Sequence, residues 1–330
     1  MSKGIGRGYR ALAWGVGMAL GLLVATAEAS AARVLDTLRI VAPAAPGGGY
    51  DRTARAMQQA IEEARLARKV QVINVPGAAG AIGLAQFIKN DRGRGDALIV
   101  GGFGMVASFL TSKSVVTLKD VTPVARLTGE FLLVVVPEAS RFRTLADLTA
   151  ALKADPGAVS IAGGPAGGTD HIAAALLAEA VGVGGNRVNY VAFSGGSGDS
   201  IASLVGNQVS AGFGGYSELI GHVRAGKLRA LGITAEARVP GLDIPTLREQ
   251  GIDVTLVNWR GVSAPPDLEP RQRQAYLDLV DRMVKSDAWK AELAKNGWSD
   301  QYLSGDRFVE YLDAEQARVE KVLRGLGLLK

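Results

Sequence analysis

Residues 38–61, LRIVAPAAPGGGYDRTARAMQQAI, contain the pattern that decides the fold. Residues 38–41 are apolar enough for a buried strand, and residues 43–49 form a loop rich in proline and glycine. From Asp51 onward apolar residues recur at helical spacing, so a helix is expected there. A strand, a glycine-rich loop and a helix in this order form the repeating unit of an α/β protein.

The same unit recurs along the rest of the chain. Further strands are predicted at 70–75, 97–100, 131–136, 159–161, 188–193, 209–213 and 228–234, with an extended segment at 254–264. Helices are predicted at 82–90, 145–153, 170–181, 201–205 and 217–225, and 271–328 is predicted to be almost entirely helical. This alternation predicts an α/β fold with two parallel-rich sheets flanked by helices.

The length of the chain favours two domains. We expect the chain to cross between them near 127–131 and again near 258–264, which gives a discontinuous first lobe (30–130 plus 256–330) and a second lobe (131–255). In such folds the ligand lies where loops at the carboxyl ends of the strands face each other, so a cleft between the lobes is predicted.

The N-terminus has the layout of a secretory signal peptide. Lys3, Arg7 and Arg10 precede an apolar run over 11–27, and Ala27-Glu28-Ala29 fits a cleavage site. We therefore expect residues 1–29 to be removed and the protein to reach the periplasm. A retained membrane anchor is the alternative, although three glycines interrupt a run that is marginal for spanning roughly 30 Å of hydrocarbon.

Composition excludes several classes of protein. The chain has no cysteine, which excludes disulfides, thiolate metal sites and lipid attachment through cysteine. Lysine and arginine are scattered without a basic block, so no nucleic-acid partner is expected. No P-loop is present, and the G-x-G-x-x-A match at 102–107 follows a third strand, where a dinucleotide fingerprint does not belong. No cofactor and no metal are expected.

Five glycine-rich loops follow predicted strands and precede helices, at 46–51, 76–80, 101–104, 163–169 and 194–198. Glycine lets the backbone approach a ligand closely, and the first turn of a helix offers unpaired N–H groups and partial positive charge. These loops predict a cleft that holds an anion largely through main-chain groups.

Three side chains in these loops have both structural and functional interpretations. Asp51 either caps a helix and shapes its loop or contacts a ligand hydroxyl, amine or water. Thr169 either caps a helix or donates its hydroxyl to a carboxylate. His171 is interpreted as structural, because neither a nucleophile elbow nor a zinc-binding motif accompanies it, and no enzymatic activity is expected.

An ordered set of motifs resembles the TctC/Bug family, the periplasmic receptors of tripartite tricarboxylate transporters. The set begins with Pro43-x-x-Pro46-Gly47-Gly48-Gly49-Tyr50-Asp51 and Asn74-Val75-Pro76-Gly77-Ala78. It continues with Gly167-Gly168-Thr169-Asp170-His171, Gly206-Asn207-Gln208-Val209, Gly226-Lys227-Leu228-Arg229 and Trp259-Arg260-Gly261-Val262. The resemblance covers essentially the whole chain after residue 29.

The resemblance implies a two-lobed type II periplasmic-binding-protein fold that captures a small carboxylate. A di- or tricarboxylate such as citrate is foremost, and amino acids and aromatic acids are the other ligand classes that the resemblance implies. Carried over, the substrate-binding residues are Pro46, Gly47, Gly48, Tyr50, Asp51 and Ala79 in the first lobe and Thr169, Phe193, Ser194, Gly195 and Tyr216 in the second. The chain departs from the family pattern at 193–196 and at Arg260, where an uncharged aromatic residue is common. Arg260 is either a partner for a further carboxylate or a solvated strand residue.

The resemblance also implies partners: the small carboxylate and the membrane permease subunits of a tripartite transporter, with the receptor itself a monomer. Two other functions are compatible with the sequence. One is an exported hydrolase that uses Asp51 or His171, and the other is a receptor that docks on a membrane sensor.

Overall fold

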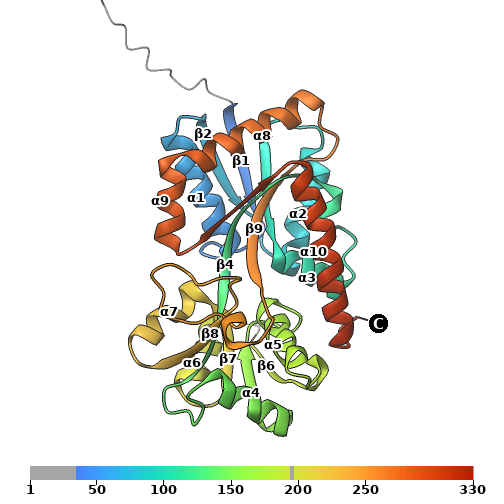
Figure 1. The fold of residues 1–330 in the computed structure, drawn as a ribbon. Helices are drawn as coiled ribbons and strands as arrows, with labels where there is room; N and C mark the ends of the chain where they lie inside the picture. The colour runs from blue at the N-terminus through green and yellow to red at the C-terminus, as the bar shows by residue number, and fades with distance from the viewer. Residues whose placement is uncertain (1–34, 194–196, 330) are drawn as a thin grey trace, which may run out of the picture. The chain divides into compact units, whose positions relative to one another are not determined.

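The predicted alternation of strands and helices is present in the computed structural model, which describes residues 35–193 and 197–329 (Figure 1). The predicted signal peptide and the candidate ligand residues Ser194 and Gly195 lie outside the described residues. No helix among the described residues is both long and apolar enough to cross a membrane.

The first set of strands forms a mixed sheet. Its strands are β1 (Leu35–Ala42), β2 (Ala67–Asn74), β3 (Ala97–Gly102), β9 (Val257–Ala264) and β10 (Ser299–Ser304). β1 pairs in parallel with β2 and β3, whereas β9 lies antiparallel between β3 and β4 (Thr122–Pro137). Its helices are α1 (Gly49–Glu63), α2 (Ala81–Asp91), α3 (Phe103–Ser112), α8 (Pro270–Lys285), α9 (Asp287–Asn296) and α10 (Asp306–Gly325).

The second set has the same organisation. Its strands are β5 (Ser160–Gly163), β6 (Asn189–Ala192), β7 (Ala211–Gly215) and β8 (Leu228–Ile233). β5 pairs in parallel with β6 and β7. Its helices are α4 (Leu145–Ala154), α5 (Thr169–Ala180), α6 (Ser197–Val205) and α7 (Tyr216–Arg224).

A single long strand, β4 (Thr122–Pro137), belongs to both sets (Figure 1). It pairs with β9 as far as Phe131, opposite Val257, and with β7 from Leu132, opposite Gly215. The first crossing therefore falls at Phe131 and Leu132, and the chain returns at the start of β9. From the sequence, only residues 131–136 of this strand were predicted, because the partly polar residues before them show no clear alternation of apolar and polar side chains. Since β4 belongs to both sets, the exact lobe boundaries stay a prediction.

The C-terminal segment is not almost entirely helical, as the sequence had indicated. Strand β10 interrupts the helices and pairs antiparallel with the first half of β4. Its sequence, SDQYLS, is mostly polar and carries no strand-like alternation. Pairing with an available strand decides its conformation, which is a case of tertiary context overriding local propensity.

Thr234 ties the two crossings together. Its side chain is fully buried, and its hydroxyl accepts a hydrogen bond from the Leu132 amide (2.9 Å) and donates one to the Leu256 carbonyl (2.7 Å). Both partners lie where the chain passes between the two sets of strands.

Replacing Thr234 with valine should lower the free energy of unfolding by about 1–3 kcal/mol, because a buried amide and a buried carbonyl each lose a partner. Urea denaturation would measure the loss. Thr149→Val is the control, since the Thr149 hydroxyl makes one local bond inside α4 and a smaller loss is expected. Equal effects of the two substitutions would contradict the assigned role of Thr234.

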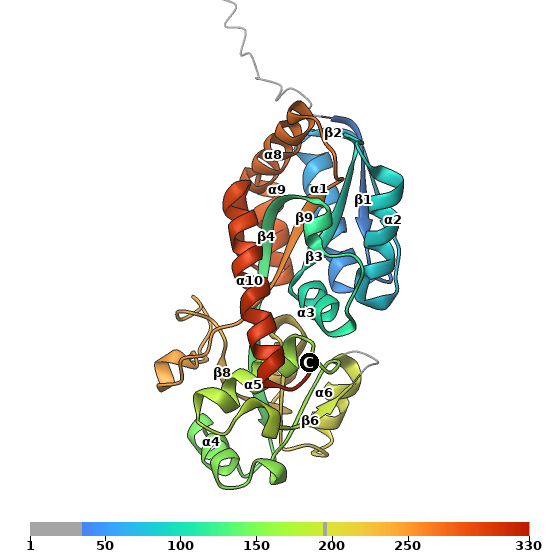
Figure 2. The same ribbon diagram turned by 90° about the vertical axis from the view of Figure 1, so that its right-hand side faces the viewer.

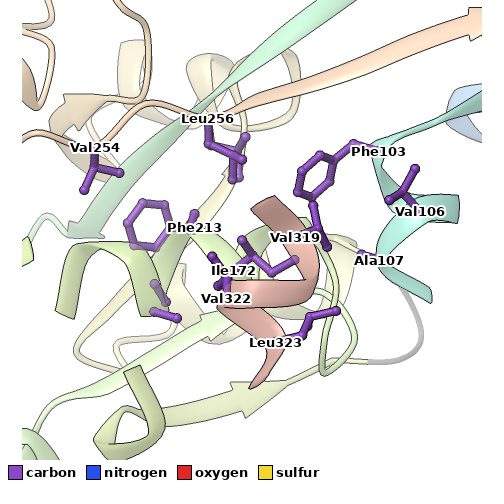
Figure 3. Packing of buried hydrophobic residues seen from close by; sticks show 14 of the residues in the cluster. Phe103, Val106, Ala107, Ile172, Phe213, Val254, Leu256, Val319, Val322 and Leu323 are labelled. Atoms are coloured by element: carbon purple, nitrogen blue, oxygen red, sulfur yellow. The ribbon is translucent and has the colours of Figure 1, made fainter. Parts of the chain in front are cut away.

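Helix α10 packs against both sets of strands and helices (Figures 1 and 2). Figure 3 shows Val319, Val322 and Leu323 of α10 between Phe103 of α3 and Ile172 of α5, all within one continuous buried cluster. The two sets of elements therefore share one part of the apolar core.

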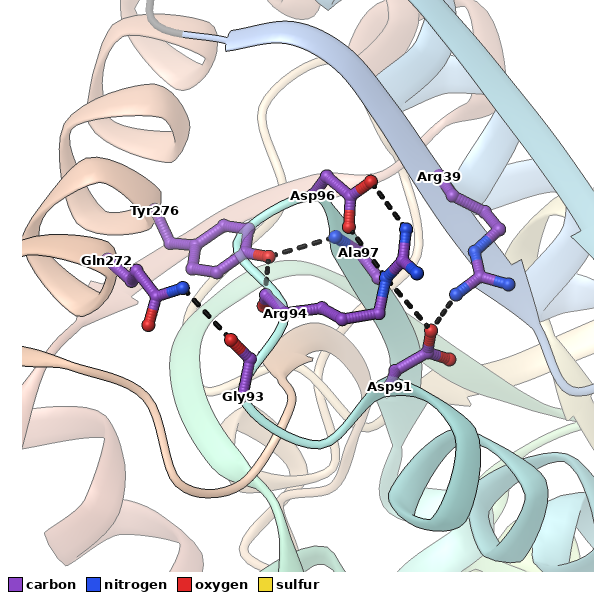
Figure 4. A network of polar contacts seen from close by, with 8 residues as sticks. All are labelled: Arg39, Asp91, Gly93, Arg94, Asp96, Ala97, Gln272 and Tyr276. Atoms are coloured by element: carbon purple, nitrogen blue, oxygen red, sulfur yellow. Dashed lines mark hydrogen bonds and ion pairs between the residues drawn. The ribbon is translucent and has the colours of Figure 1, made fainter.

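A polar network fixes the start of β3 to α8 (Figure 4). The Tyr276 hydroxyl accepts a hydrogen bond from the Ala97 amide (2.9 Å) and donates one to the Arg94 carbonyl (3.2 Å). The buried Asp91 at the end of α2 forms ion pairs with Arg39 and Arg94. These contacts join α8, near the C-terminus, to β1, α2 and β3, near the N-terminus. They lie at the edge of the sheet where the parallel strands begin, so the loops at the opposite edge are free to form a site.

Candidate functional site

A cavity of about 570 Å³ lies where the two sets of elements face each other. Its lining comes from three sources: the loops and helix starts of the first set, those of the second set, and the two crossing strands. The first contributes positions in 43–50, 76–80 and 104–108, the second contributes positions in 164–170 together with Gly215 and Glu218, and the crossing strands contribute Glu130, Asn258 and Arg260. A smaller cavity of about 250 Å³ between α3 and α10 is lined largely by apolar side chains and aliphatic stems.

Five helices begin at the larger cavity, and glycine is the N-cap residue of each. These helices are α1, α2, α3, α5 and α7, with caps Gly48, Gly80, Gly102, Gly168 and Gly215, and none of the caps makes a side-chain hydrogen bond. Away from the cavity, Thr144 caps α4 and Ser286 caps α9 through their side chains, although α10 also begins after a glycine. First-turn amides that lack a side-chain acceptor are suited to bind an anion.

Asp51 stabilises the first glycine-rich loop through hydrogen bonds. Its carboxylate is 2% exposed and accepts hydrogen bonds from the Gly47 amide (2.8 Å), Asn74 Nδ2 (2.8 Å) and Arg55 Nε (2.9 Å). Burial by itself would raise the pKa of Asp51, but the bonds from Arg55, Gly47 and Asn74 outweigh it and hold the pKa below its ordinary value. Because its oxygens are occupied within the loop, Asp51 supports the cavity and does not line it.

Tyr50 joins the starts of two helices at the cavity wall. The side chain is half-buried, and its hydroxyl accepts a hydrogen bond from the Met105 amide of α3 (3.1 Å). Burial raises the pKa of Tyr50 to about 12, while the nearby Arg260 and the Met105 amide lower it. The hydroxyl therefore stays protonated, and its own proton remains available to a ligand.

A charged pair lies at the back of the cavity on the crossing strands. Glu130 of β4 is 2% exposed, and its Oε1 accepts hydrogen bonds from the amide and hydroxyl of Ser217 at the start of α7. Its Oε2 lies 3.8 Å from Nη1 of Arg260 on β9. Arg260 is 7% exposed, so it is not the solvated strand residue that was one of the two interpretations.

Asp170 adds a second, half-buried carboxylate. Its Oδ2 accepts a hydrogen bond from the Gly164 amide (2.8 Å). Burial raises the pKa of Asp170 to about 7; the Gly164 bond lowers it, and the neighbouring carboxylates of Glu218 and Glu130 raise it further. Asp170 therefore changes its charge near neutral pH.

His171 has a structural role. Its Nδ1 accepts a hydrogen bond from the Gly167 amide (3.0 Å), and its ring stacks on Tyr190 with 4.1 Å between the ring centres. Burial lowers the pKa of His171 below its ordinary value, which favours the neutral ring that this bond requires.

The structure brings together three of the candidate binding residues, since Tyr50, Ala79 and Thr169 line the cavity. Thr169 does not cap α5; it is the first residue of the helix, after Gly168. Pro46, Gly47, Gly48 and Asp51 form the supporting part of the first loop and are absent from the described lining.

The remaining candidates lie further off. Phe193 packs on the apolar cluster of the second set, and its amide donates to the Gly163 carbonyl (3.0 Å). Tyr216 begins α7 and lies beside Gly297 at the end of α9. Neither is in the described lining, and their roles in binding stay predictions.

Sequence reasoning missed three acidic residues of the lining, Glu130, Asp170 and Glu218. For Glu130 a signal existed, because it is the one charged residue at the start of the apolar run EFLLVVV. Asp170 and Glu218 gave none, since acidic residues are ordinary in the first turn of a helix.

Comparison with known proteins gives consistent results. A family model described as "TctC: Tripartite tricarboxylate transporter family receptor" matches residues 53–328. Protein BugT of Bordetella pertussis is 26% identical over 318 residues, which cover 93% of this chain and 96% of that protein.

Solved structures show the same fold. A TctC solute-binding protein from Polaromonas superposes with a TM-score of 0.73 at 25% identity, covering 88% of this chain and 98% of that one. A protein of R. palustris solved with adipate superposes with a TM-score of 0.75 at 24% identity, covering 88% and 97%. The predicted two-lobed α/β fold is confirmed.

Proposed function

Because the chain belongs to the TctC family of tripartite tricarboxylate transporter receptors, we propose that it captures a small carboxylate in the cavity and delivers it to the permease subunits of such a transporter. The family resemblance predicted from the ordered motifs is confirmed by the family model and by BugT. The family consists of periplasmic binding proteins, and we place this protein in the periplasm after removal of residues 1–29.

The observation that carries the proposal is the convergence of glycine-capped helices on one cavity. None of the five cap residues supplies a side-chain acceptor to the first-turn amides. In α3, the Met105 amide donates to the Tyr50 hydroxyl. In α7, Glu130 supplies an acceptor to the Ser217 amide. A carboxylate placed against the first-lobe helices would receive several charge-assisted hydrogen bonds.

The same geometry favours binding over hydrolysis. Nδ1 of His171 is held by the Gly167 amide, and the carboxylate of Asp51 is occupied by three donors. Because Nδ1 accepts that bond, the neutral His171 ring carries its proton on Nε2 and has no free acceptor nitrogen, and both oxygens of Asp51 already accept hydrogen bonds. A general base must reach the proton that it removes.

Delivery to a permease requires two distinguishable states of the receptor. The lining comes from both sets of elements, so a ligand that touches both would favour the closed arrangement of the lobes. The crossing strands β4 and β9 are the segments about which the lobes would rotate. We propose that the permease recognises the closed surface.

A ligand screen tests the proposal. Purified protein, freed of co-purified ligand by unfolding and refolding, would be scanned by thermal shift against monocarboxylates, dicarboxylates, tricarboxylates such as citrate, and amino acids. A ligand at 100 times its dissociation constant stabilises the native state by about 2.7 kcal/mol, which raises the melting temperature measurably. At least one carboxylate should give this shift and be recovered chemically unchanged. A flat screen would contradict carboxylate capture, and turnover of the ligand would contradict a purely binding role.

A further inference from the structure

We propose that the cavity is built for a carboxylate that also carries a positively charged nitrogen, with Arg260 binding an anionic group of the ligand and Glu130, Asp170 and Glu218 facing the cation. The inference rests on the proposed function, because it narrows the class of carboxylate. Among the ligand classes that the resemblance implies, it favours amino acids over the di- or tricarboxylate that was expected first.

The first argument is the unsatisfied donor on Arg260. Its Nη1 is buried and has no hydrogen-bond partner among the described residues, and the whole side chain is 9% exposed. Glu130 Oε2 lies 3.8 Å away, close enough for charge attraction but too far for a hydrogen bond. Arg260 lines the cavity, and a guanidinium group with an unpaired N–H favours a ligand that brings an oxygen to it.

The position of Arg260 strengthens this requirement. A Cβ atom on Gly49 would lie only 2.5 Å from Nη2 of Arg260, so the guanidinium rests on the first turn of α1. The start of a helix carries partial positive charge, and a cation placed there is unfavourable unless an anion lies close to both. Glu130 is one such anion on the strand side, and the open cavity is the place for a second.

The second argument is the excess of carboxylates over cations in the lining. Glu130, Asp170 and Glu218 line the cavity, whereas Arg260 is the one lysine or arginine among its described lining residues. The Glu218 carboxylate makes no hydrogen bond or ion pair within residues 35–193 and 197–329. A ligand with only negative groups would leave this excess unbalanced.

A metal ion does not account for the carboxylates. Within the described residues no three histidine, aspartate or glutamate side chains are grouped closely enough to hold one. An ammonium group suits the arrangement better, because it distributes three N–H donors among separate acceptors. The carboxylate at the other end of the ligand would then lie on the glycine-capped helices of the first set.

The titration of Asp170 gives the inference a distinctive signature. Its carboxyl group faces the Gly164 amide on its own loop, Glu218 on α7 and Glu130 on β4, and it also interacts with the Tyr190 ring system on β6. A bound ammonium group would favour the ionised form and release a proton, since the pKa of Asp170 is about 7 without ligand. A second ligand carboxylate in the same place would favour the protonated form and take up a proton.

Isothermal titration calorimetry with matched acids tests the inference. The pairs are succinate and aspartate, glutarate and glutamate, and adipate and 2-aminoadipate; malate serves as a second control for aspartate, because it carries a hydroxyl where aspartate carries the ammonium group. In the pair of the right length, the aminated acid should bind about tenfold or more tightly. Titrations in buffers of different ionisation enthalpy should show proton release near pH 7, and affinity should rise as the pH is raised from 6 to 8.

The outcomes separate this inference from the proposed function. If unaminated diacids bind as tightly as their aminated partners in every pair, or bind with proton uptake, the cationic class is wrong while carboxylate capture stands. If none of these acids binds and the wider screen is also flat, both are wrong. Tight binding of an aminated acid alone supports both.

Three variants test the assigned residues. Glu218→Gln keeps the shape of the side chain but removes its charge. It should lower the affinity for the aminated acid about tenfold, while the affinity for the unaminated acid should stay the same or rise. Glu236→Gln, at an exposed position, is the matched control and should change neither affinity. Arg260→Gln should weaken both members of a pair. An unchanged ratio between aminated and unaminated acids in Glu218→Gln would overturn the role of the acidic residues.

Discussion

Aspartate in place of Gly104 should weaken carboxylate binding by about 100-fold or more, with little loss of stability in the ligand-free protein. Gly104 is the second residue of α3 and lines the cavity. A side chain there would begin 3.2 Å from the Tyr50 hydroxyl and extend over the first-turn amides. Its carboxylate would occupy the donors that otherwise bind the ligand.

The size of this effect follows from charge repulsion. Two like charges about 4 Å apart cost roughly 4 kcal/mol at the effective dielectric constant near a protein surface. Since each 1.4 kcal/mol or so is tenfold in affinity, the loss should exceed about 100-fold. Folding should be spared, because an acidic residue in the first turn of a helix stabilises it by about 0.3–1 kcal/mol.

Gly104→Asn is the matched control for this prediction. Asparagine has the same shape without the charge, so its affinity should stay within about tenfold of the parent protein. Calorimetry against the best acid of the screen measures both variants. Equal losses would mean that the side chain acts by bulk, and unchanged binding in Gly104→Asp would remove α3 from the anion site.

Alanine in place of Trp259 should lower the free energy of unfolding by about 3–5 kcal/mol, the usual range for a large buried aromatic residue. The ring is 1% exposed and packs edge-on against Phe308 and Tyr311 of α10, with ring centres 5.9 and 5.8 Å away. Its Nε1 also donates a hydrogen bond to the buried Glu315 (3.2 Å). The substitution leaves both a cavity and a weakened polar network between β9 and α10.

Trp259→Phe separates the two contributions. Phenylalanine keeps most of the apolar volume but not the N–H, so a smaller loss of about 1–3 kcal/mol is expected from the hydrogen bond. Urea denaturation measures both variants. An alanine variant that loses less than about 1 kcal/mol would show that β9 is not held by this contact, since that is the size of an average substitution.

The sequence predicted the order of most strands and helices, because local signals set them. The strand at 38–41, the glycine loop and the helix after it are present in the structure within a few residues of the prediction. In these elements the spacing of the apolar residues follows the face that is buried. The strand at 299–304 carried no such signal, because its pairing partner lies far away in the sequence and supplies the reason for its conformation.

The candidate site could be predicted in part. Glycine before a helix indicates accessible amides, and it led to four loops that meet at the cavity, at 46–51, 76–80, 101–104 and 163–169. The fifth predicted loop, at 194–198, lies partly outside the described residues and stays a prediction. The sequence could not distinguish Asp170 and Glu218 from ordinary first-turn acids, because their role depends on which helix starts converge. Arg260 was noticed only as an unusual residue, and its contact with Glu130 depends on two strands being side by side.

The position of β9 between β3 and β4 also governs when the protein can fold. Ile99 pairs with Ser263, and Gly129 pairs with Ser299, so the first sheet waits for the last quarter of the chain. Contacts this distant in sequence slow folding, because the intervening chain must be ordered before they form. In a partly synthesised chain, the edges of β3 and β4 therefore have no pairing partner. Unpaired strand edges favour aggregation with other chains, so this risk lasts until the chain has been made as far as residue 304. If the chain is exported unfolded, as the proposed periplasmic location requires, the same delay is an advantage, because no stable first lobe forms before the chain has crossed the membrane.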